Sequence, residues 1–493
     1  MVRWVWDRDS RGVWERYQVG VDRIGSGCED RDCLRQSDAP GGVPMIRFPA
    51  LLGSVALAVT CLAAPAAQAV TAGPAVTVGA AASGHVGQDF AGFSYEKDRI
   101  GAGMFDAADT NLVRLFRLLG PSSLRVGANL VDMTPWNPNG AGGSPTEVAP
   151  SDVLKLAKFA KATGWSVIYG LNLKTGTPES AADEAAFAAK ALGHSLAAFE
   201  VGNEPNFYRT EAAYEASYES YVTAIRAKVP GAVFDGPGVT NGQNAWLPPF
   251  TAKEKSNGLS MLTMHSYIGD QTTGTIAGML AANGKGYEDK DETALQTAKA
   301  ANNIPKWRMS EANSYYHGGT AGVSNVQAAS LWSLDFMYGI AAHNGDGVNF
   351  HGGTSTQWPL NYSPIKFDNL APVGVQGVFY GELLWSLAGT GAVHPATVTG
   401  ATDVTAWGIG NNVIVNNKGT SAQTFTVNLR SAAFMGTEYV LTAPTLDSTA
   451  ITIAGSGVDV KGSFHPAPKL VRVHGHTATI TVPAGSAALL KTV

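Results

Sequence analysis

Short apolar runs alternate with helical runs from about Phe90 onward, and this alternation most constrains the fold. The strand-like runs occur at 90–95, 123–126, 166–172, 198–204, 232–236, 262–265, 306–311 and 347–351. Helical stretches lie between them, for example at 107–119, 151–163, 210–228 and 323–343. Parallel strands joined by helices form α/β sheets, and eight such units close into a barrel. We therefore predict an α/β protein built on a (β/α)8 TIM barrel.

The pattern changes after about residue 388, where helical periodicity disappears. Short runs rich in Val and Thr follow, at 404–408, 413–416, 424–429, 438–442, 450–454, 469–474 and 477–482. Turn residues separate these runs, as is typical of an antiparallel β-sandwich. The sequence therefore predicts a catalytic barrel over 89–387 and a C-terminal β-sandwich domain over 388–493. A strand-like region at 70–88 precedes the barrel and could join the sandwich sheet.

The segment 45–69 has the features of a secretory signal. Met45 and Arg47 precede a charge-free apolar run at 50–64, and a small-residue A-Q-A site ends at Ala69. This arrangement is typical of a cleaved signal peptide, and the apolar run is short for a membrane span. We expect a secreted protein with no membrane association in its mature form. We interpret 1–44 as a non-native or disordered extension upstream of the true start, with a genuine charged extension as the alternative.

Composition narrows the class of partner. The net charge is −5 and the charged fraction is 15%, so the chain lacks the basic surface of nucleic-acid-binding proteins. All three cysteines, Cys28, Cys33 and Cys61, precede the predicted cleavage point. The mature chain would then contain no disulfide, and we expect no metal and no cofactor. A carbohydrate is the partner that the remaining motifs indicate.

Two glutamates stand at the carboxyl ends of predicted strands. Glu204 ends F-E-V-G-N-E-P, and Glu311 lies in W-R-M-S-E-A-N. Catalytic groups of TIM barrels gather at these strand ends, and a glycosidase needs two carboxyl groups flanking the scissile bond. Asn203 could bind a sugar 2-hydroxyl, and Arg125 could hold the second carboxylate ionised. An alternative for Arg125 is a purely structural ion pair.

Further polar residues are predicted at the same end of the barrel. Besides the two glutamates, Arg125 and Asn203, the predicted strand ends carry Glu96, Asn129, Asn172, His265, Tyr267 and His351. A single residue of this kind is most often structural. Their convergence on one rim instead favours a binding site.

Five motifs together resemble glycoside hydrolase family 79 of clan A, which contains bacterial β-glucuronidases and heparanases. They are F-S-Y-E (93–96), S-L-R-V-G-A-N (123–129), F-E-V-G-N-E-P-N (199–206), H-S-Y (265–267) and S-E-A-N-S-Y-Y-H-G-G (310–319). N-E-P alone is specific only to the clan, whereas the set is specific to the family. The resemblance extends from about residue 75 to the C-terminus.

The resemblance implies a role for each matching residue. Glu204 matches the acid/base, Glu311 the nucleophile, Tyr267 a tyrosine beside the nucleophile and Glu96 a carboxylate that binds distal hydroxyls. Tyr316 and Gly318 match the loop that receives the uronate carboxylate, and Tyr362 is the candidate contact from the loop after the eighth strand.

Three functions are compatible with the sequence. The first is a secreted, retaining, exo-acting β-glucuronidase that hydrolyses terminal β-linked glucuronic acid, which could carry a 4-O-methyl group. The second is an endo-acting, heparanase-like enzyme or another clan A glycosidase; the modest Lys/Arg content disfavours a heparan sulfate cleft. The third is a carbohydrate-binding protein without catalysis, which the presence of both strand-end glutamates argues against.

Overall fold

The computed structural model describes residues 3–8, 14–19, 73–282 and 287–492. Residues 70–493 form one compact unit. In the remaining part of the chain, strands β1 (Arg3–Arg8) and β2 (Trp14–Val19) pair antiparallel, a pairing that the sequence analysis did not predict. The predicted signal peptide at 45–69 lies outside the described residues. In the parts of the chain described, no helix is long and apolar enough to cross a membrane.

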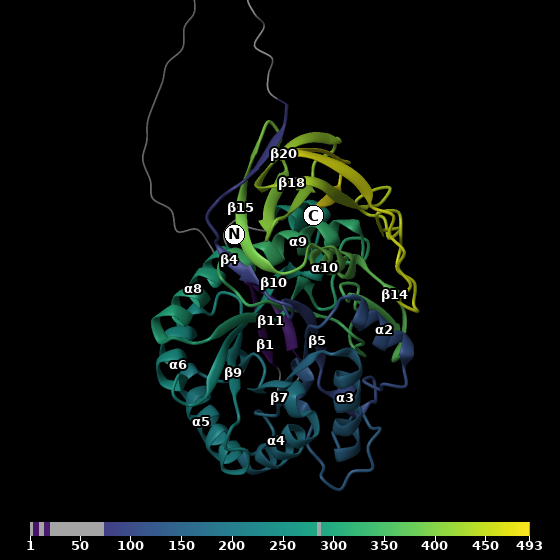
Figure 1. The fold of residues 1–493 in the computed structure, drawn as a ribbon. Coiled ribbons are helices and arrows are strands. Elements are labelled where there is room, and N and C mark those ends of the chain that lie inside the picture. Colours follow the sequence, from purple (N-terminus) through teal and green to yellow (C-terminus); the bar gives the residue numbers. More distant parts are fainter. Residues whose placement is uncertain (1–2, 9–13, 20–72, 283–286, 493) are drawn as a thin grey trace, which may run out of the picture. The chain divides into compact units, whose positions relative to one another are not determined.

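A closed barrel of eight strands forms the first part of the compact unit (Figure 1). In the order of their pairing the strands are β10 (Leu259–Asp270), β11 (Lys306–Tyr316), β12 (Val348–His351), β5 (Ala91–Glu96), β6 (Ser123–Gly127), β7 (Ser166–Leu171), β8 (Leu196–Val201) and β9 (Phe234–Thr240). All neighbours pair in parallel. The predicted TIM barrel is therefore confirmed, and each predicted strand overlaps an observed one.

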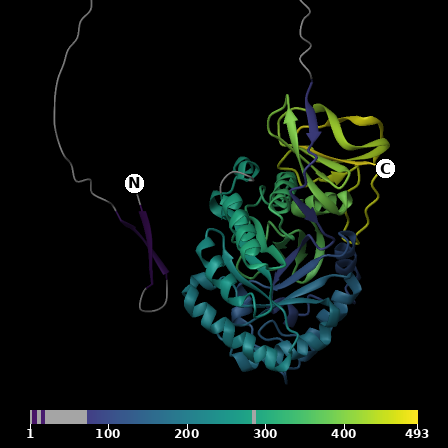
Figure 2. The same ribbon diagram turned by 60° about the vertical axis from the view of Figure 1, so that its left-hand side comes forward.

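Helices surround the barrel (Figure 2). They are α1 (Asp98–Gly101), α2 (Thr110–Leu118), α3 (Pro150–Thr163), α4 (Pro178–Leu192), α5 (Glu211–Lys228), α6 (Leu247–Glu254), α7 (Ile276–Ala282), α8 (Tyr287–Asn302), α9 (Gln327–Ala342) and α10 (Gly377–Ala388). Local sequence explains where several begin. The Thr210 hydroxyl accepts a hydrogen bond from the Ala213 amide at 3.3 Å and so caps α5, because the first amides of a helix lack partners within it.

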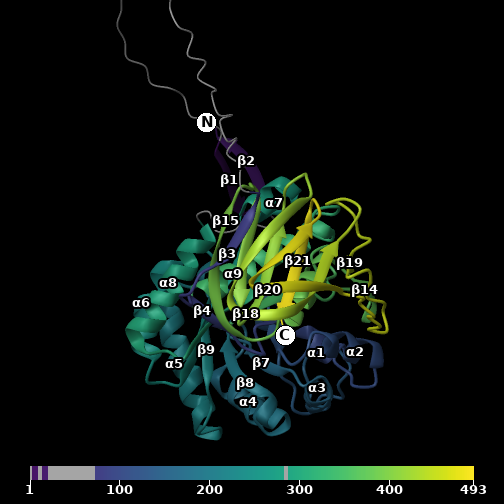
Figure 3. The same cartoon turned by 45° about the horizontal axis from the view of Figure 1, so that its top comes forward.

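The C-terminal region is a nine-stranded sheet (Figure 3). Its strands are β3 (Ala75–Val78), β4 (Gly84–Val86), β15 (Gly391–Thr399), β16 (Val404–Ile409), β17 (Asn412–Asn417), β18 (Gln423–Thr442), β19 (Thr452–Ile453), β20 (Lys469–Val482) and β21 (Ser486–Thr492). β3 pairs antiparallel with β15 and parallel with β18. The strand that precedes the barrel in sequence thus belongs to the C-terminal sheet.

Alternate residues of this sheet face two different cores. In β17, Ile414 belongs to the core shared with the barrel helices, whereas Val413 and Val415 belong to a separate core within the sheet region. In β21, Leu489 belongs to the core shared with the barrel helices and Leu490 to the separate core. Successive side chains of a strand point to opposite faces, so one layer of the sheet both packs on the barrel and encloses its own core. This is the two-faced packing of a sandwich.

Two predicted details differ from the structure. Two pairs of runs that the sequence predicted as separate strands are continuous in the structure. The runs 424–429 and 438–442 both lie in β18, and the runs 469–474 and 477–482 both lie in β20. Register shifts interrupt the pairing of these two long strands. A hairpin of β13 (Ile365–Asp368) and β14 (Ala371–Val375), and the strands β15 and β21, were not predicted. Because β-bulges keep a bent strand continuous, turn-like residues do not always end it.

Candidate active site

The two predicted catalytic glutamates meet at the carboxyl end of the barrel. Glu311 is in β11, opposite His265 of β10 in the strand register. Glu204 follows β8 and begins the 3₁₀ turn η3 (Pro205–Phe207) with left-handed backbone angles, φ 45° and ψ 53°. Its amide donates to the Gly238 carbonyl at 3.0 Å, which fixes this unusual conformation. Glu204, His265 and Glu311 each place one carboxylate oxygen or ring nitrogen within 4.8 Å of the others.

Glu311 is held as a carboxylate by two neighbours. Arg125 donates to its Oε2 at 2.7 Å, and the Tyr267 hydroxyl donates to its Oε1 at 2.8 Å. Burial by itself would raise the pKa of Glu311. The imidazoles of His351 and His265, the positive charge of Arg125 and the Tyr267 hydrogen bond lower that pKa to about 2 instead. A charge-assisted hydrogen bond stabilises the ionised form of its acceptor.

Arg125 lies beneath the carboxylates rather than at the open rim. Its side chain is completely buried. Besides Glu311, its guanidinium donates to Glu200 at 2.6 Å, to Ser94 at 2.9 Å and to Asn203 at 2.8 Å. The ion pairs with Glu200 and Glu311 raise its pKa even though burial would lower it. Arg125 thus contacts the second carboxylate, as the sequence analysis expected, and its enclosed guanidinium is better suited to position Glu311 and Asn203 than to contact a substrate directly.

His265 lies beside Glu204, as Arg125 lies beside Glu311. It is fully buried, and its Nδ1 is 2.9 Å from Glu204 Oε1. The other ring nitrogen, Nε2, has no hydrogen-bond partner among the described residues. His265 was predicted as a binding residue, and the geometry places it behind the Glu204 carboxylate.

Glu96 enters the site from β5 in a different ionisation state. It is 9% exposed, and the Leu130 amide donates to its Oε2 at 2.7 Å. Burial and the nearby Glu311 charge raise the pKa of Glu96 to about 8, although the Leu130 amide opposes that rise. The site thus contains one carboxyl group that is ionised at neutral pH and one that is protonated.

The predicted amides and the aromatic residues also converge here. Asn203 donates to the exposed Asn129 at 3.4 Å. The Tyr267 ring is 6.4 Å from that of Tyr316 and 6.2 Å from that of Tyr362. The Tyr362 amide donates to the Gly318 carbonyl at 3.2 Å. These contacts place Asn129, Tyr316, Gly318 and Tyr362 around the groups that already contact Glu311 and Arg125.

Two residues of the predicted rim have other surroundings. Asn172 accepts hydrogen bonds from the Thr175 and Gly176 amides, both at 3.0 Å, so it builds the turn after β7. His351 is nearly buried, with Nδ1 3.8 Å from Glu311 Oε2, and burial lowers its pKa. The sequence analysis did not single out Ser94 and Ser310, which complete the polar layer: Ser310 donates to Glu200 at 3.3 Å. Both lie within motifs given above, F-S-Y-E (93–96) and S-E-A-N-S-Y-Y-H-G-G (310–319), and their positions close to the strand-end glutamates could have identified them.

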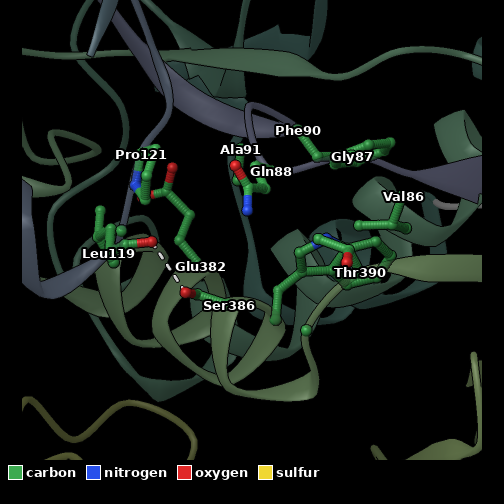
Figure 4. A pocket seen from close by; sticks show the side chains of 13 residues that line it. Val86, Gly87, Gln88, Phe90, Ala91, Leu119, Pro121, Glu382, Ser386 and Thr390 are labelled. Carbon is green, nitrogen blue, oxygen red and sulfur yellow. Dashed lines mark hydrogen bonds between the residues drawn. The ribbon is translucent and has the colours of Figure 1, made fainter. Parts of the chain in front are cut away.

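A separate cavity lies at the other end of the barrel (Figure 4). It has a volume of about 150 Å³ and is lined by residues that precede β6, such as Leu119, by Ala91 at the start of β5, and by Glu382 of α10. Glu382 is 1% exposed, and neither of its oxygens has a hydrogen-bond partner in the described residues. No second carboxylate lines this cavity. A single carboxylate does not supply the pair that glycoside hydrolysis needs, whereas Glu204 and Glu311 at the opposite rim do.

Similar proteins bear names that agree with this chemistry. No protein-family model matches the chain. A β-glucuronidase of Aspergillus niger is 25% identical over 305 residues, covering 53% of this chain and 56% of that protein. A β-glucuronidase of Neurospora crassa is 27% identical over 252 residues, covering 44% and 45%. The chain therefore spans about half the length of the curated relatives that it matches.

Comparison with solved structures concerns the fold. A 4-O-α-L-rhamnosyl-β-D-glucuronidase from Fusarium oxysporum superposes with a TM-score of 0.71 at 20% identity, covering 84% of this chain and all of that one. An α-L-arabinofuranosidase of family 51 from Bifidobacterium longum gives a TM-score of 0.62 at 14% identity, covering 85% and 99%. At such identities the likeness shows the fold alone, which is that of barrel glycoside hydrolases with an added sheet-rich region.

Proposed function

We propose that this chain is a retaining, exo-acting β-glucuronidase of glycoside hydrolase family 79. One observation carries the proposal: an oxygen of Glu204 and an oxygen of Glu311 lie within 4.8 Å of each other at the carboxyl end of the barrel. Retaining glycosidases hold their two carboxyl groups about 5–5.5 Å apart, whereas inverting ones separate them by about 6.5–9.5 Å to admit a water. The short separation favours double displacement.

In the first step Glu311 is the nucleophile and Glu204 the acid. The ionised Glu311 attacks the anomeric carbon, and Glu204 gives its proton to the departing glycosidic oxygen. The aglycone leaves as an alcohol, and the sugar remains as an ester of Glu311. Arg125 and Tyr267 support the nucleophile's charge in the free enzyme. His265, bonded to Glu204 Oε1, orients the acid.

In the second step the same two groups exchange roles. Glu204, now a carboxylate, accepts a proton from a water that attacks the anomeric carbon. The ester bond to Glu311 breaks, and the sugar leaves with its original anomeric configuration. Asn203, which Arg125 holds by a 2.8 Å hydrogen bond, is positioned to bond the sugar 2-hydroxyl.

Glucuronic acid suits the charges of the site. A uronate is an anion, and a second ionised carboxylate near it would repel it. Because the pKa of Glu96 is raised to about 8, this residue can approach the sugar as a neutral hydrogen-bond donor. Tyr316 and the backbone of Gly318 would bind the uronate carboxylate, while Tyr362 and Asn129 would complete the pocket. The names of the two fungal relatives support the same substrate class.

Secretion is part of the proposal. It rests on the charge-free run at 50–64 and the A-Q-A sequence ending at Ala69. N-terminal sequencing of protein recovered from the culture medium should give a first residue near Val70. Recovery only from the cell interior with residues 45–69 still attached would contradict it.

A panel of aryl glycosides tests the activity. We expect hydrolysis of the β-glucuronide at least about tenfold faster than that of the β-glucoside, β-galactoside, β-xyloside or α-arabinofuranoside, as one good hydrogen bond to the carboxylate would provide. Proton NMR should show the β-anomer as the first product. A preferred neutral glycoside would contradict the glucuronide assignment, and a first α-anomer from the β-glycoside would contradict retention.

A further inference from the structure

An exposed apolar side chain stands directly beside the proposed acid. Phe207 is 73% exposed, and its amide donates to the Glu204 backbone carbonyl at 3.0 Å. It therefore lies one 3₁₀ turn from the group that protonates the leaving oxygen. Within residues 73–282 and 287–492 no other ring contacts that of Phe207. The exposed ring is available to a bound ligand, since covering it would remove apolar surface from water.

The neighbours of Phe207 are fixed in place. Asn206 donates to the Thr240 hydroxyl at 2.9 Å, and the Thr240 amide donates back to Asn206 at 3.2 Å. On the other side, the Tyr208 hydroxyl donates to Asp132 at 2.7 Å. The turn is thus held toward β9 by one neighbour and toward the loop after β6 by the other. Phe207 is presented on a rigid support, which lowers the entropic cost of binding against it.

A second apolar side chain belongs to the same part of the rim. Met133 follows Asp132 and is 68% exposed. Asp132 also accepts hydrogen bonds from the Leu173 and Lys174 amides at 3.0 and 3.1 Å. The loops after β6 and β7 and the turn after β8 are therefore joined through Asp132. In the sequence, Phe207 directly precedes Tyr208 and Met133 directly follows Asp132.

The rim beside the nucleophile is built differently. There Tyr316, His317 and Trp358 contact one another, and the His317 and Trp358 rings stack at 4.6 Å. These aromatic side chains already have partners, and they flank the side on which the glycone carboxylate is proposed to bind. The unpartnered apolar surface lies on the side of the acid, where the leaving group must be.

We propose that Phe207 and Met133 form an aglycone subsite that favours an apolar, aryl-bearing leaving group; this rests on the proposed glucuronidase activity. The leaving oxygen must lie within hydrogen-bond reach of Glu204, so the group attached to it emerges past the turn that carries Phe207. An aromatic aglycone would cover the ring and remove both apolar surfaces from water. A sugar in the same place could lay only its C–H face on these side chains and would remove less apolar surface from water than an aryl group.

The test compares leaving groups of similar basicity. Methyl, 2-phenylethyl and xylosyl β-glucuronides all release alcohols, so differences in kcat/KM report mainly on aglycone binding. We expect the unmodified protein to prefer the phenylethyl substrate over methyl by about tenfold, the gain from burying part of a phenyl ring. Phe207→Ala should reduce this ratio to about one or two, through KM for the phenylethyl substrate. Phe207→Trp should keep it, and Met133→Ser should reduce it less.

Phe434→Ala is the matched control, because Phe434 is 88% exposed but lies on β18 of the C-terminal sheet; the ratio should not change. An unchanged ratio in Phe207→Ala, a ratio near one in the unmodified protein, or a preference for the xylosyl substrate would overturn the inference while leaving glucuronidase activity in place. Failure to hydrolyse any of the three glucuronides would instead overturn the proposed function and the inference together.

Discussion

Glu311 and Glu382 are two buried glutamates at opposite ends of one barrel, and their surroundings differ completely. Glu311 is 4% exposed and receives hydrogen bonds from Arg125 and Tyr267. Glu382 is 1% exposed and has no partner among the described residues. The pKa of Glu311 is lowered to about 2, whereas burial raises the pKa of Glu382 well above its usual value. Burial therefore does not decide ionisation; the partners do.

This difference has a functional meaning. In the proposed mechanism Glu311 must be ionised before substrate arrives, and the positively charged Arg125 under the rim favours that state. Burial raises the pKa of the Glu382 carboxyl, in the cavity of Figure 4, and so disfavours the ionised form that a nucleophile needs. Strongly shifted pKa values indicate functional sites only when a specific partner causes the shift.

Arg125→Met should have the largest effect on stability. It would leave Glu200 and Glu311 buried without their shared cation, and breaking a buried pair in this way costs roughly 3–5 kcal/mol. The stabilisation from the lowered Glu311 pKa is present above about pH 4.5 and is lost as pH falls toward 2. Denaturant unfolding at pH 7 measures the change, with Glu382→Met as the matched variant; it removes a buried carboxyl that has no partner among the described residues and should lose no stability. Equal losses in the two variants would contradict the comparison.

Glu382→Gln should change how stability depends on pH. The folded protein retains the Glu382 proton above pH 4.5 while the unfolded chain releases it, so stability falls as pH rises, by up to about 1.4 kcal/mol per pH unit. Glutamine removes this contribution, and the variant should gain stability relative to the unmodified protein between pH 5 and pH 7. Parallel stability curves for the two proteins would show that Glu382 has an unrecognised partner.

Glu96→Gln tests the protonated carboxyl within the site. If neutral Glu96 donates to the sugar, kcat/KM should fall as pH rises through about 8, because the ionised form loses the donor and repels the uronate. Glutamine keeps a neutral donor at all pH values. When each protein's kcat/KM is divided by its own value at pH 6, the ratio for the variant should exceed that for the unmodified protein by about tenfold once pH is well above that pKa. An alkaline limb that persists unchanged in the variant belongs to another group.

Tyr316→Phe should have a smaller effect, because Tyr316 is 39% exposed and water can replace part of its hydrogen bond. We expect kcat/KM for an aryl glucuronide to fall roughly fivefold, or about 1 kcal/mol, which is less than the roughly 1.5–3 kcal/mol of a hydrogen bond to a charged group that is shielded from water. Residual glucosidase activity should hardly change. Equal losses on both substrates would mean that Tyr316 only packs the loop after β11.

The sequence predicted the framework because the framework is periodic. Eight apolar runs spaced by helices leave few arrangements other than a barrel, and strand ends then place Glu204 and Glu311 on one rim. The sequence did not predict that Arg125 is enclosed beneath these two glutamates or that the pKa of Glu96 is raised. Those properties depend on which side chains meet across strands, such as Ser94 opposite Arg125 between β5 and β6, and on how far water is excluded.

The sheet region was harder to predict for a related reason. The strand β18 continues from Gln423 to Thr442 through Arg430 and Ser431, residues that a local reading assigns to a turn. Its continuity comes from long-range pairing with β20, β21 and β3. Strand propensity depends on such neighbours more than helix propensity does.

Covalent trapping tests the central claim, that Glu311 is the ionised nucleophile, most directly. A 2-fluoro-glucuronide with an activated leaving group should form a stable ester with the protein, and proteolysis with mass spectrometry should locate it. We predict that the label lies on Glu311 and that Glu311→Gln is neither labelled nor active, with a loss of at least about 10⁴-fold in kcat. A label on Glu204, Glu96 or any other carboxylate would contradict the account.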